Sequence, residues 1–228
     1  FTRGGRMWLA EGPQERPLLE VASLPITHGG RIGFQVDNML ASAAAGWFLG
    51  LEDSVLRMAL ATFHSDTGTV PARFNLIEHA GATIILDYGH NAAALRALVE
   101  AVGSIEHERR VVVYTAAGDR RDEDIIEQAR ILGDAFDEIV VYEDQCTRGR
   151  EPGVIIELMK QGLALGTRLK LTHHASGEMA AIQLALDNLR AKDLLLCQID
   201  QVDLGLEFVN KWLAAHGASA VAVGAKSA

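Results

Sequence analysis

Cysteine is scarce in this chain, which has only Cys146 and Cys197 among its 228 residues. The two lie far apart and outside any spacing typical of a metal site, so we expect a reduced, cytoplasmic compartment. No apolar run is long enough to span a bilayer, which argues against a membrane protein. The N-terminus, Phe1-Thr-Arg-Gly-Gly, has no start methionine and no signal-peptide pattern, so we expect a piece of a longer protein.

Positive charge is also in short supply, because 21 Lys and Arg against 30 Asp and Glu give a net charge of -9. Nucleic acid is therefore not expected as the main partner, since binding a phosphate backbone favours a basic surface. A local basic pocket for a nucleotide is compatible with this balance. The length suggests one or two domains, and the 49% hydrophobic content is enough for a sizeable core. The composition leaves a homo-oligomer of the longer protein open.

Two phosphate-binding motifs are missing. The chain has no Gly-x-x-x-x-Gly-Lys-[Ser/Thr] loop, so it has no self-contained machinery for binding a nucleoside triphosphate through that motif. It also has no Gly-x-Gly-x-x-Gly, so a dinucleotide fingerprint is not supported. Any nucleotide site in this chain has to be built from other residues.

The pattern of apolar residues predicts an α/β protein. Strands are predicted at 6–10, 17–21, 73–79, 82–88, 111–116, 138–142, 168–172 and 194–199. Helices are predicted at 35–49, 53–63, 91–103, 122–135, 152–164, 177–190 and 203–215. Several of the later strands are continuously apolar, which is typical of strands covered on both faces of a parallel sheet. We therefore predict a Rossmann-like, doubly wound, mostly parallel six-stranded sheet, preceded by a partial α/β segment.

The predicted domain boundaries follow from changes in this rhythm. Residues 1–64 form the partial segment, and 65–72 read as a linker. The six-stranded domain occupies 73–216, and 217–228 read as a flexible tail of small residues. Asp53 or Ser54 is the predicted cap of the second helix.

The densest polar cluster lies where two predicted strands end. Arg73 precedes these strands, and Asp87-Tyr-Gly-His90-Asn91 follows them directly. Ligands of open α/β sheets bind outside the carboxyl ends of the strands, so these residues suggest a built site. Asp87 could hold a ribose diol or cap the helix that starts near Asn91. A metal held by Asp87 and His90 alone is not expected, because two ligands do not make a site.

Two charged loops follow other buried strands. In the segment 115–124, a glycine turn with Arg120 feeds a helix start, where backbone N–H groups can hold an anion. The alternative is a solvated charged turn with Asp122 as the cap. The segment 142–150 carries two acids and two arginines, which could recognise the cationic side chain and the carboxylate of an amino acid. The alternative there is an exposed ion-pair loop.

Two further polar pairs have alternative interpretations. Gln35 and Asn38 stand at a helix start, where amides can either cap the helix or read a purine edge. His173 and His174 are adjacent on a predicted strand and point to opposite faces. A shared metal is therefore not expected, and we predict that both are surface polar residues.

Five motifs, in this order and spacing, resemble those of the Mur ligase family. The segment from Phe34 is similar to the family's His-Asn-x-x-Asn-x-Leu-Ala-Ala helix, and Pro71-Ala-Arg73 to its Pro-Gly-Arg turn. Asp87-Tyr-Gly-His-Asn91 resembles Asp-Tyr-Ala-His-Asn-Pro. The charged segments 117–124 and 142–150 look specifically like those of family members that build an arginine-bearing polymer.

The resemblance implies an ATP-dependent amide ligase, in which a carboxylate is phosphorylated and an amine displaces phosphate. Within the family it implies addition of arginine to the aspartate side chains of an aspartate-containing polymer. Residues 1–64 would end the central ATPase domain, and 73–216 would be the C-terminal domain. The Walker loop, the Mg²⁺-binding acid and a modified lysine would all lie upstream. The fragment alone is therefore expected to be inactive.

The resemblance also implies roles for individual residues. Gln35 and Asn38 would contact adenine, Arg73 the phosphates, and Asp87 the ribose, with His90 lining the same nucleotide pocket. The residues expected to face the incoming amino acid are Asp119, Arg120, Asp122, Glu143, Asp144, Arg148 and Arg150. We assign no catalytic residue and no metal ligand within this chain.

Other functions stay open at this stage. Ala72 and Ala92 stand where the family has glycine and proline, which motivates a non-catalytic polymer-binding or assembly module derived from a Mur ligase. A nucleotide-dependent oxidoreductase on a Rossmann-like fold would lack its glycine fingerprint. Among ligases, the amine substrate could be another amino acid or a preformed dipeptide instead of arginine.

Overall fold

The computed structural model describes residues 1–144 and 146–217. These residues form two compact units, one of residues 1–65 with 100–104, and one of 66–99 with the described residues from 105 onward. No helix among them is both long enough and apolar enough to span a bilayer. Apart from Gly217, the predicted tail lies outside the described residues.

The first unit combines a small antiparallel sheet with two helices. Its elements are β1 (Thr2–Arg3), β2 (Arg6–Glu11), β3 (Gln14–Glu20), α1 (Gly33–Phe48) and α2 (Asp53–Thr62). Its core is formed by the buried side chains Met7, Leu9, Leu18, Val21, Leu24, Ile26, Met39, Ala43, Leu56 and Leu60. The predicted strand at 6–10 and both predicted helices are confirmed. The strand predicted at 17–21 begins three residues earlier, and β1 was not predicted. One face of the small sheet is buried, because Met7 and Leu9, two residues apart in β2, point to the same side and are covered, as is Leu18 of β3.

The predicted cap of α2 is wrong. The N-cap residue is Glu52, and no side chain caps the helix. Asp53 lies one position inside the helix, and its carboxylate instead accepts hydrogen bonds from Arg16 Nε at 2.8 Å and Nη2 at 3.0 Å. This bidentate pairing lowers the pKa of Asp53. The fork geometry of the arginine therefore outweighs the local capping preference.

The second unit is built on a six-stranded sheet. Its strands are β4 (Asn75–His79), β5 (Ala82–Asp87), β6 (Arg109–Tyr114), β7 (Glu138–Tyr142), β8 (Leu171–Ala175) and β9 (Asp193–Gln198). The strand order is β4-β5-β9-β6-β7-β8. Only β4 runs antiparallel to its neighbour, and all other pairs are parallel. The predicted mostly parallel, six-stranded sheet is confirmed.

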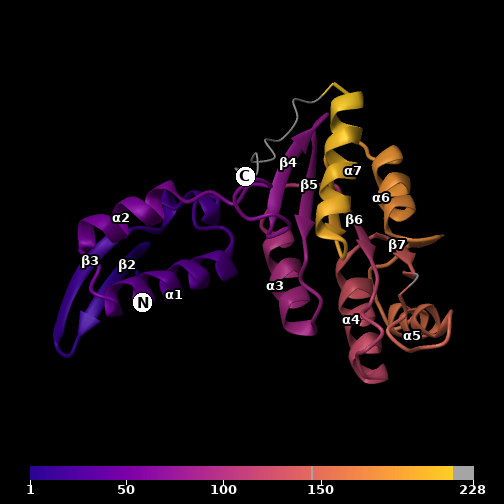
Figure 1. The fold of residues 1–228 in the computed structure, drawn as a ribbon, viewed down its shortest axis with the longest axis horizontal. Helices are drawn as coiled ribbons and strands as arrows, with labels where there is room; N and C mark the ends of the chain where they lie inside the picture. The colour runs from indigo at the N-terminus through magenta and orange to yellow at the C-terminus, as the bar shows by residue number, and fades with distance from the viewer. Residues whose placement is uncertain (145, 218–228) are drawn as a thin grey trace. The chain divides into compact units, whose positions relative to one another are not determined.

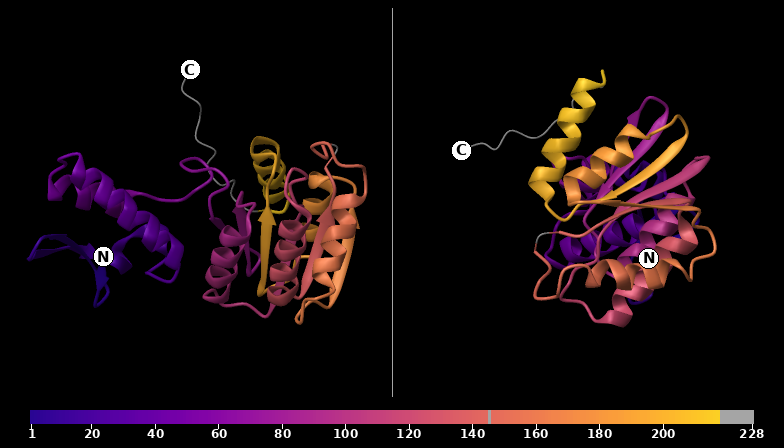
Figure 2. Two further views of the ribbon diagram at one scale, coloured as in Figure 1. Left: turned by 90° about the horizontal axis from the view of Figure 1, so that it is seen from below. Right: turned by 90° about the vertical axis from the view of Figure 1, so that its right-hand side faces the viewer.

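Helices cover both faces of this sheet (Figures 1 and 2). The helices are α3 (Ala92–Gly103), α4 (Asp122–Ala135), α5 (Val154–Leu163), α6 (Glu178–Asp187) and α7 (Val202–Ala215). Figure 2 shows α6 and α7 on one face of the sheet and α3, α4 and α5 on the other. Every residue of β5 and β9 is buried, which explains their continuously apolar sequences. The predicted doubly wound arrangement is therefore correct.

The edge strand β8 starts three residues later than predicted. Arg168 and Lys170, which were predicted to lie in the strand, precede it and pair with Asp137. The Asp137 carboxylate accepts hydrogen bonds from Arg168 Nη2 at 2.8 Å and Lys170 Nζ at 3.0 Å. Sequence periodicity does not register such a contact.

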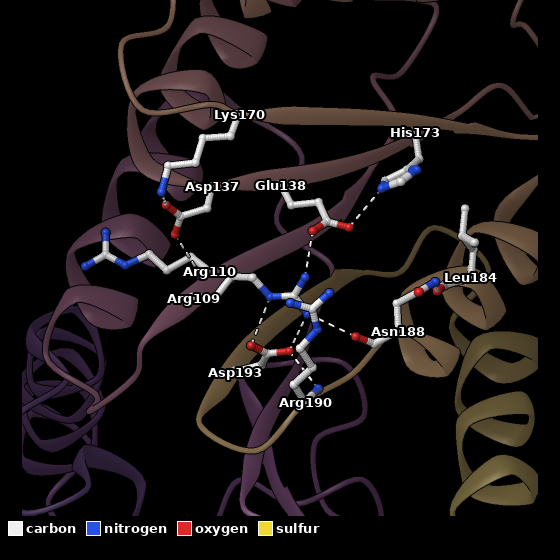
Figure 3. A network of polar contacts seen from close by, with 10 residues as sticks. All are labelled: Arg109, Arg110, Asp137, Glu138, Lys170, His173, Leu184, Asn188, Arg190 and Asp193. Carbon is white, nitrogen blue, oxygen red and sulfur yellow. Dashed lines mark hydrogen bonds and ion pairs between the residues drawn. The ribbon is translucent and has the colours of Figure 1, made fainter.

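The amino-terminal edge of the sheet is fixed by a network of ion pairs (Figure 3). Arg109 of β6 reaches Asp193 of β9 and Glu138 of β7, the latter at 2.7 Å. His173 of β8 lies 2.9 Å from the other oxygen of Glu138. His173 is therefore a partly exposed member of this polar network, and His174 is exposed, in keeping with the prediction that both are surface polar residues. This network ties four parallel strands together at one edge.

Candidate functional site

The opposite, carboxyl edge of the sheet gathers most of the predicted site residues. Loops leave this edge after β5, β6, β7 and β9, and they carry the charged motifs. All of these strands are parallel, so their carboxyl ends meet at the same edge.

Asp87 holds together the two ends of the β4–β5 hairpin. The residue is only 7% exposed. Its Oδ2 accepts a hydrogen bond from the backbone N–H of Phe74 at 2.9 Å, and its Oδ1 accepts one from Gly89 at 2.6 Å. Burial raises the pKa of Asp87, while these two hydrogen bonds and the charge of Arg73 oppose that rise. Asp87 does not cap α3, because Asn91 Oδ1 accepts the N–H of Ala94 at 2.8 Å.

The turn that carries Arg73 has an unusual backbone. Ala72 and Phe74, on either side of it, adopt left-handed conformations with φ of 52° and 55°. Residues other than glycine adopt this region only when the surroundings hold them there. Asp87 supplies one such restraint through Phe74, and Asn75 supplies another by accepting the N–H of Ala72 at 2.7 Å. The strained turn sets the direction in which the guanidinium of Arg73 leaves the backbone.

Tyr88 connects the residues that the sequence singled out. The guanidinium carbon of Arg73 lies 5.2 Å from the centre of the Tyr88 ring, within the range of a cation–π contact. The His90 ring meets the same tyrosine edge-on, with 4.8 Å between ring centres. The structure therefore brings Arg73, Asp87 and His90 together around Tyr88, which the sequence analysis did not single out. Its position inside the Asp-Tyr-Gly-His motif was the available signal.

The imidazole of His90 is directed toward the loops after β7 and β9. Its Nδ1 donates a hydrogen bond to the carbonyl of Tyr88. Its Nε2 lies 3.7 Å from Oδ1 of Asp200, and Nη2 of Arg148 lies 3.7 Å from the same oxygen. Burial lowers the pKa of His90, the Tyr88 carbonyl and Asp200 raise it, and the charges of Arg148 and Arg120 lower it, with a net lowering.

Asp200 was missed by the sequence analysis. It lies two residues beyond the end of a fully buried strand, β9, which is the same kind of position that drew attention to His90. The sheet order places β9 directly beside β5, so that Asp87 and Gln198 are register partners. The two strands are more than a hundred residues apart in the chain, and no local pattern shows that they pair.

The loops after β6 and β7 form one charged cluster. Arg148 faces the carboxylate of Asp119, with both oxygens at 3.4 Å. Arg150 donates to the carbonyl of Gly118 at 2.6 Å, to Asp122 at 2.7 Å and to the carbonyl of Arg120. Four predicted substrate residues, together with the backbone of a fifth, are therefore in mutual contact.

The contacts of Arg150 show that it orders the loop. Its donors are directed at three groups of the segment 118–122, and its side chain is only 19% exposed. Asp122 is the first residue of α4 and not its cap, because the N-cap position is Arg121. Where the two loops meet, a Cβ on Gly118 would lie 2.0 Å from the carbonyl oxygen of Thr147. Only glycine fits at this close approach.

A depression of about 580 Å³ lies at the ends of β7, β8 and β9. Its charged lining residues among those described are the acids Glu143, Asp144 and Glu178. Both oxygens of Glu143 face the N–H of Gly153, at 2.8 and 3.0 Å, where α5 begins. Glu178 is 2% exposed and accepts backbone N–H groups of the loop after β9, at 2.9 and 3.0 Å. Burial raises the pKa of the Glu178 carboxyl. Glu178 was not among the site residues predicted from the sequence.

Gln35 and Asn38 belong to the first unit and are paired with each other. Nδ2 of Asn38 donates to Oε1 of Gln35 at 3.0 Å across one turn of α1. Gln35 is 3% exposed, and neither amide caps the helix, whose N-cap is Ile32. The capping interpretation is therefore wrong. In the part of the chain that the structure describes, no group of three or more His, Cys, Asp or Glu side chains could hold a metal ion.

An α/β sheet with helices on both faces and a polar cluster at its carboxyl edge defines the second unit as a Rossmann-like domain. Comparison with protein families makes the class specific. The family model described as "Mur ligase, glutamate ligase domain" matches residues 72–198, and the chain belongs to the Mur ligase family. This family comprises ATP-dependent ligases that join acids to amino acids.

Curated relatives include cyanophycin synthetases. The chain is 31% identical over 205 residues to "Cyanophycin synthetase" of Synechocystis sp., a match that covers 90% of this chain and 23% of that protein. It is 28% identical over 205 residues to the protein of the same name from Nostoc sp., with the same coverage. The chain therefore spans about a quarter of the length of these relatives.

Solved structures share the fold. A pseudomurein peptide ligase type C from Methanothermus fervidus has a TM-score of 0.61 at 21% identity, covering 92% of this chain and 41% of that one. E. coli FolC in complex with ADP has a TM-score of 0.60 at 19% identity, covering 78% of this chain and 40% of that one. At these identities the similarity supports the fold alone.

Proposed function

We propose that this chain is part of an ATP-dependent amide ligase that adds arginine to the aspartate side chains of a polymer through an acyl phosphate. Membership of the Mur ligase family and the similarity to cyanophycin synthetases support this function. The observation that carries it is the meeting of two motifs at one sheet edge. There, Asp200 faces both His90 of the Asp-Tyr-Gly-His motif and Arg148 of the charged loop after β7.

The proposed nucleotide contacts follow the predicted roles. Each oxygen of Asp87 accepts one backbone hydrogen bond and keeps a further lone pair, with which it can accept from a ribose hydroxyl. Arg73 would pair with the phosphates, for which a planar guanidinium is suited. Gln35 and Asn38 would contact adenine, and the side-chain N–H groups and carbonyl left over from their mutual hydrogen bond are the groups that could do so.

The proposed amino-acid contacts are divided between binding and support. Arg148 would bind the α-carboxylate of the amino acid, and Asp119 holds that guanidinium in place. Asp144, in the acidic depression, would attract a cationic side chain such as that of arginine. Arg150 and Glu143 use their polar atoms to fix loops, so we propose that they position the site and do not touch the substrate.

The proposed reaction requires that its substrates are positioned and that water is excluded. An acyl phosphate hydrolyses if water reaches it, and closed sites protect such intermediates. Phosphoryl transfer is accelerated mainly by alignment and by charge stabilisation, which the guanidinium of Arg73 can supply. The Mg²⁺ that accompanies ATP in such reactions is proposed to have its ligands upstream of this chain, and no step is assigned to it here.

The proposal is tested in the protein expressed from its complete reading frame. Phosphate release from ATP is measured with an aspartate polymer and arginine, lysine or aspartyl-arginine. We expect release with arginine, and a KM for ATP that rises about 10- to 100-fold in Arg73→Gln, because a charged hydrogen bond contributes roughly 1.5–3 kcal/mol. Arg96→Gln is the matched control, since Arg96 is exposed and pairs with Glu127.

Two results would overturn this function. Absence of ATP turnover with every amine would favour the non-catalytic module, and so would a reading frame that lacks Gly-Lys-Thr upstream. An unchanged KM for ATP in Arg73→Gln would remove the nucleotide role of that residue. The motivation for a non-catalytic module is weakened by Ala72, which keeps the left-handed conformation that glycine favours.

A further inference from the structure

The imidazole of His90 presents one nitrogen without a hydrogen-bond partner among the described residues. That nitrogen, Nε2, is buried, and the side chain is only 10% exposed. Most buried polar atoms have a partner, so an unpaired one at a sheet's ligand edge needs an explanation. The sequence analysis assigned His90 to the nucleotide pocket, but Nε2 faces the residues proposed to bind the amino acid.

The orientation of the ring fixes its chemistry. Because a carbonyl only accepts hydrogen bonds, the contact with Tyr88 requires the proton of neutral His90 to lie on Nδ1. The lone pair is then on Nε2. The groups that face this imidazole are Asp200, Arg148, Arg120 and the Tyr88 ring. Burial lowers the pKa of His90, so the neutral form, which can accept a proton, predominates at neutral pH.

The charges around Nε2 complement those of a zwitterion. Asp200 Oδ1 lies 3.7 Å from Nε2 and 3.7 Å from Nη2 of Arg148. Both distances exceed the roughly 3.2 Å limit of a good hydrogen bond, so neither pair of atoms forms one. An α-ammonium group could donate to Asp200 and to His90, while the adjacent α-carboxylate pairs with Arg148.

We propose that His90 is the catalytic base that takes a proton from the α-ammonium group of the incoming amino acid, with Asp200 as its positioning residue. This inference rests on the proposed ligase function. The proton moves to Nε2, and the electron pair of the N–H bond stays on nitrogen. The nitrogen then attacks the carbonyl carbon of the acyl phosphate, so that a C–N bond forms. The C–O bond to phosphate breaks with its electron pair on the departing phosphate, which also takes the second proton of the amine.

The first experiment compares two nucleophiles in the protein expressed from its complete reading frame. Hydroxylamine is largely uncharged at neutral pH, so it can trap an acyl phosphate without a base. In His90→Gln we expect the ratio of arginine ligation to hydroxamate formation to fall about 100-fold, since general base catalysis contributes roughly 10²–10⁴. His174→Gln, the same change at an exposed histidine, should keep the wild-type ratio.

The outcomes separate the two proposals. No ATP-dependent hydroxamate from the wild type would overturn the ligase function itself. Hydroxamate from the wild type, with both reactions reduced equally in His90→Gln, would overturn only the role of His90 as a base.

A second variant keeps the imidazole of His90 and removes a charge beside it. Asp200→Asn removes the negative charge that raises the pKa of His90. The acidic limb of the pH profile for arginine ligation should therefore move to lower pH, and the KM for arginine should rise. A purely structural role of Asp200 would not move that limb, so an unchanged limb would overturn the proposal even if His90→Gln failed to fold.

Discussion

Several charged side chains of the candidate site form their hydrogen bonds with other groups of the protein. Asp87 holds the turn that presents Arg73, and Arg150 holds the loop that presents Asp119. Residue type and position predicted that these side chains belong to the site, but not which of them would be satisfied internally. That distinction depends on which backbone groups lie within about 3 Å, and only folding decides it.

The loop-ordering role of Arg150 leads to a stability prediction. Arg150→Ala should lower the free energy of unfolding by about 2 kcal/mol, because it leaves the partly buried carbonyl of Gly118 and the exposed carbonyl of Arg120 without their charged donor. Urea denaturation followed by circular dichroism measures the change. Arg121→Ala is the matched control from the same loop. Its side chain is 76% exposed and pairs only with Asp124, so its effect should stay within about 0.5 kcal/mol. Equal effects of the two substitutions would contradict the role.

At the scale of elements, α4 and α5 pack unusually close. A Cβ added to Gly162 of α5 would lie 2.2 Å from the carbonyl oxygen of Ile126 and 2.7 Å from Cβ of Ala129, both on α4. The two helices can approach to this distance only because position 162 has no side chain. Glycine here lies inside a helix, where it is unfavourable by about 1 kcal/mol relative to alanine. The close packing has to outweigh that penalty.

Gly162→Ala should therefore destabilise the protein by about 1–3 kcal/mol, because overpacking outweighs the gain in helix propensity. The shift of the urea midpoint measures this. Gln161→Ala, at the exposed neighbouring position, should change stability by no more than about 0.5 kcal/mol. A stabilised Gly162→Ala variant would show that the helices separate without cost.

The elements themselves were predictable, because buried parallel strands and amphipathic helices leave distinct periodicities. The ends of the helices and strands were less predictable. The strand β8 starts later than predicted, beyond Arg168 and Lys170, which pair with Asp137. Asp53 and Asp122 do not cap α2 and α4 and pair with arginines instead. The site residues Tyr88, Asp200 and Glu178 were missed, since their importance comes from contacts across the sheet edge that local patterns do not encode.

At the scale of the whole second unit, the two edges of the sheet carry different groups of charged residues. The amino edge holds the ion-pair network of Arg109, Glu138 and Asp193 (Figure 3). Beside it, Asp137 binds Arg168 and Lys170. The carboxyl edge holds the candidate site. Stability and ligand binding therefore depend on different charges, and substitutions can separate them.

Acid should weaken the unit through Asp137. Burial opposes its charge, but hydrogen bonds from Arg168, the Arg110 backbone and Lys170 outweigh burial and lower its pKa to about 2, from the ordinary 3.8. The stabilisation is therefore complete above the ordinary pKa and is lost as the pH falls from about 4 to about 2. Its size is about 2 kcal/mol, at 1.36 kcal/mol per pKa unit and reduced for the exposed partners.

Urea midpoints measured between pH 2 and 5 test this. Asp137→Asn should flatten the decline with acid, whereas Glu157→Gln, which removes an exposed carboxylate paired with Lys160, should leave the slope unchanged. A slope in Asp137→Asn equal to that of the wild type would show that other carboxylates carry the acid sensitivity.

The position of β9 has a consequence for biosynthesis. Among the described residues this strand is the last of the sheet in sequence order, yet it occupies the place between β5 and β6 near the middle of the sheet. A growing polypeptide therefore cannot join its two halves until residue 198 has left the ribosome. Until then, the edges of β5 and β6 that β9 later covers remain unpaired and can pair with other chains. Chaperones or fast folding would protect the nascent domain from such aggregation.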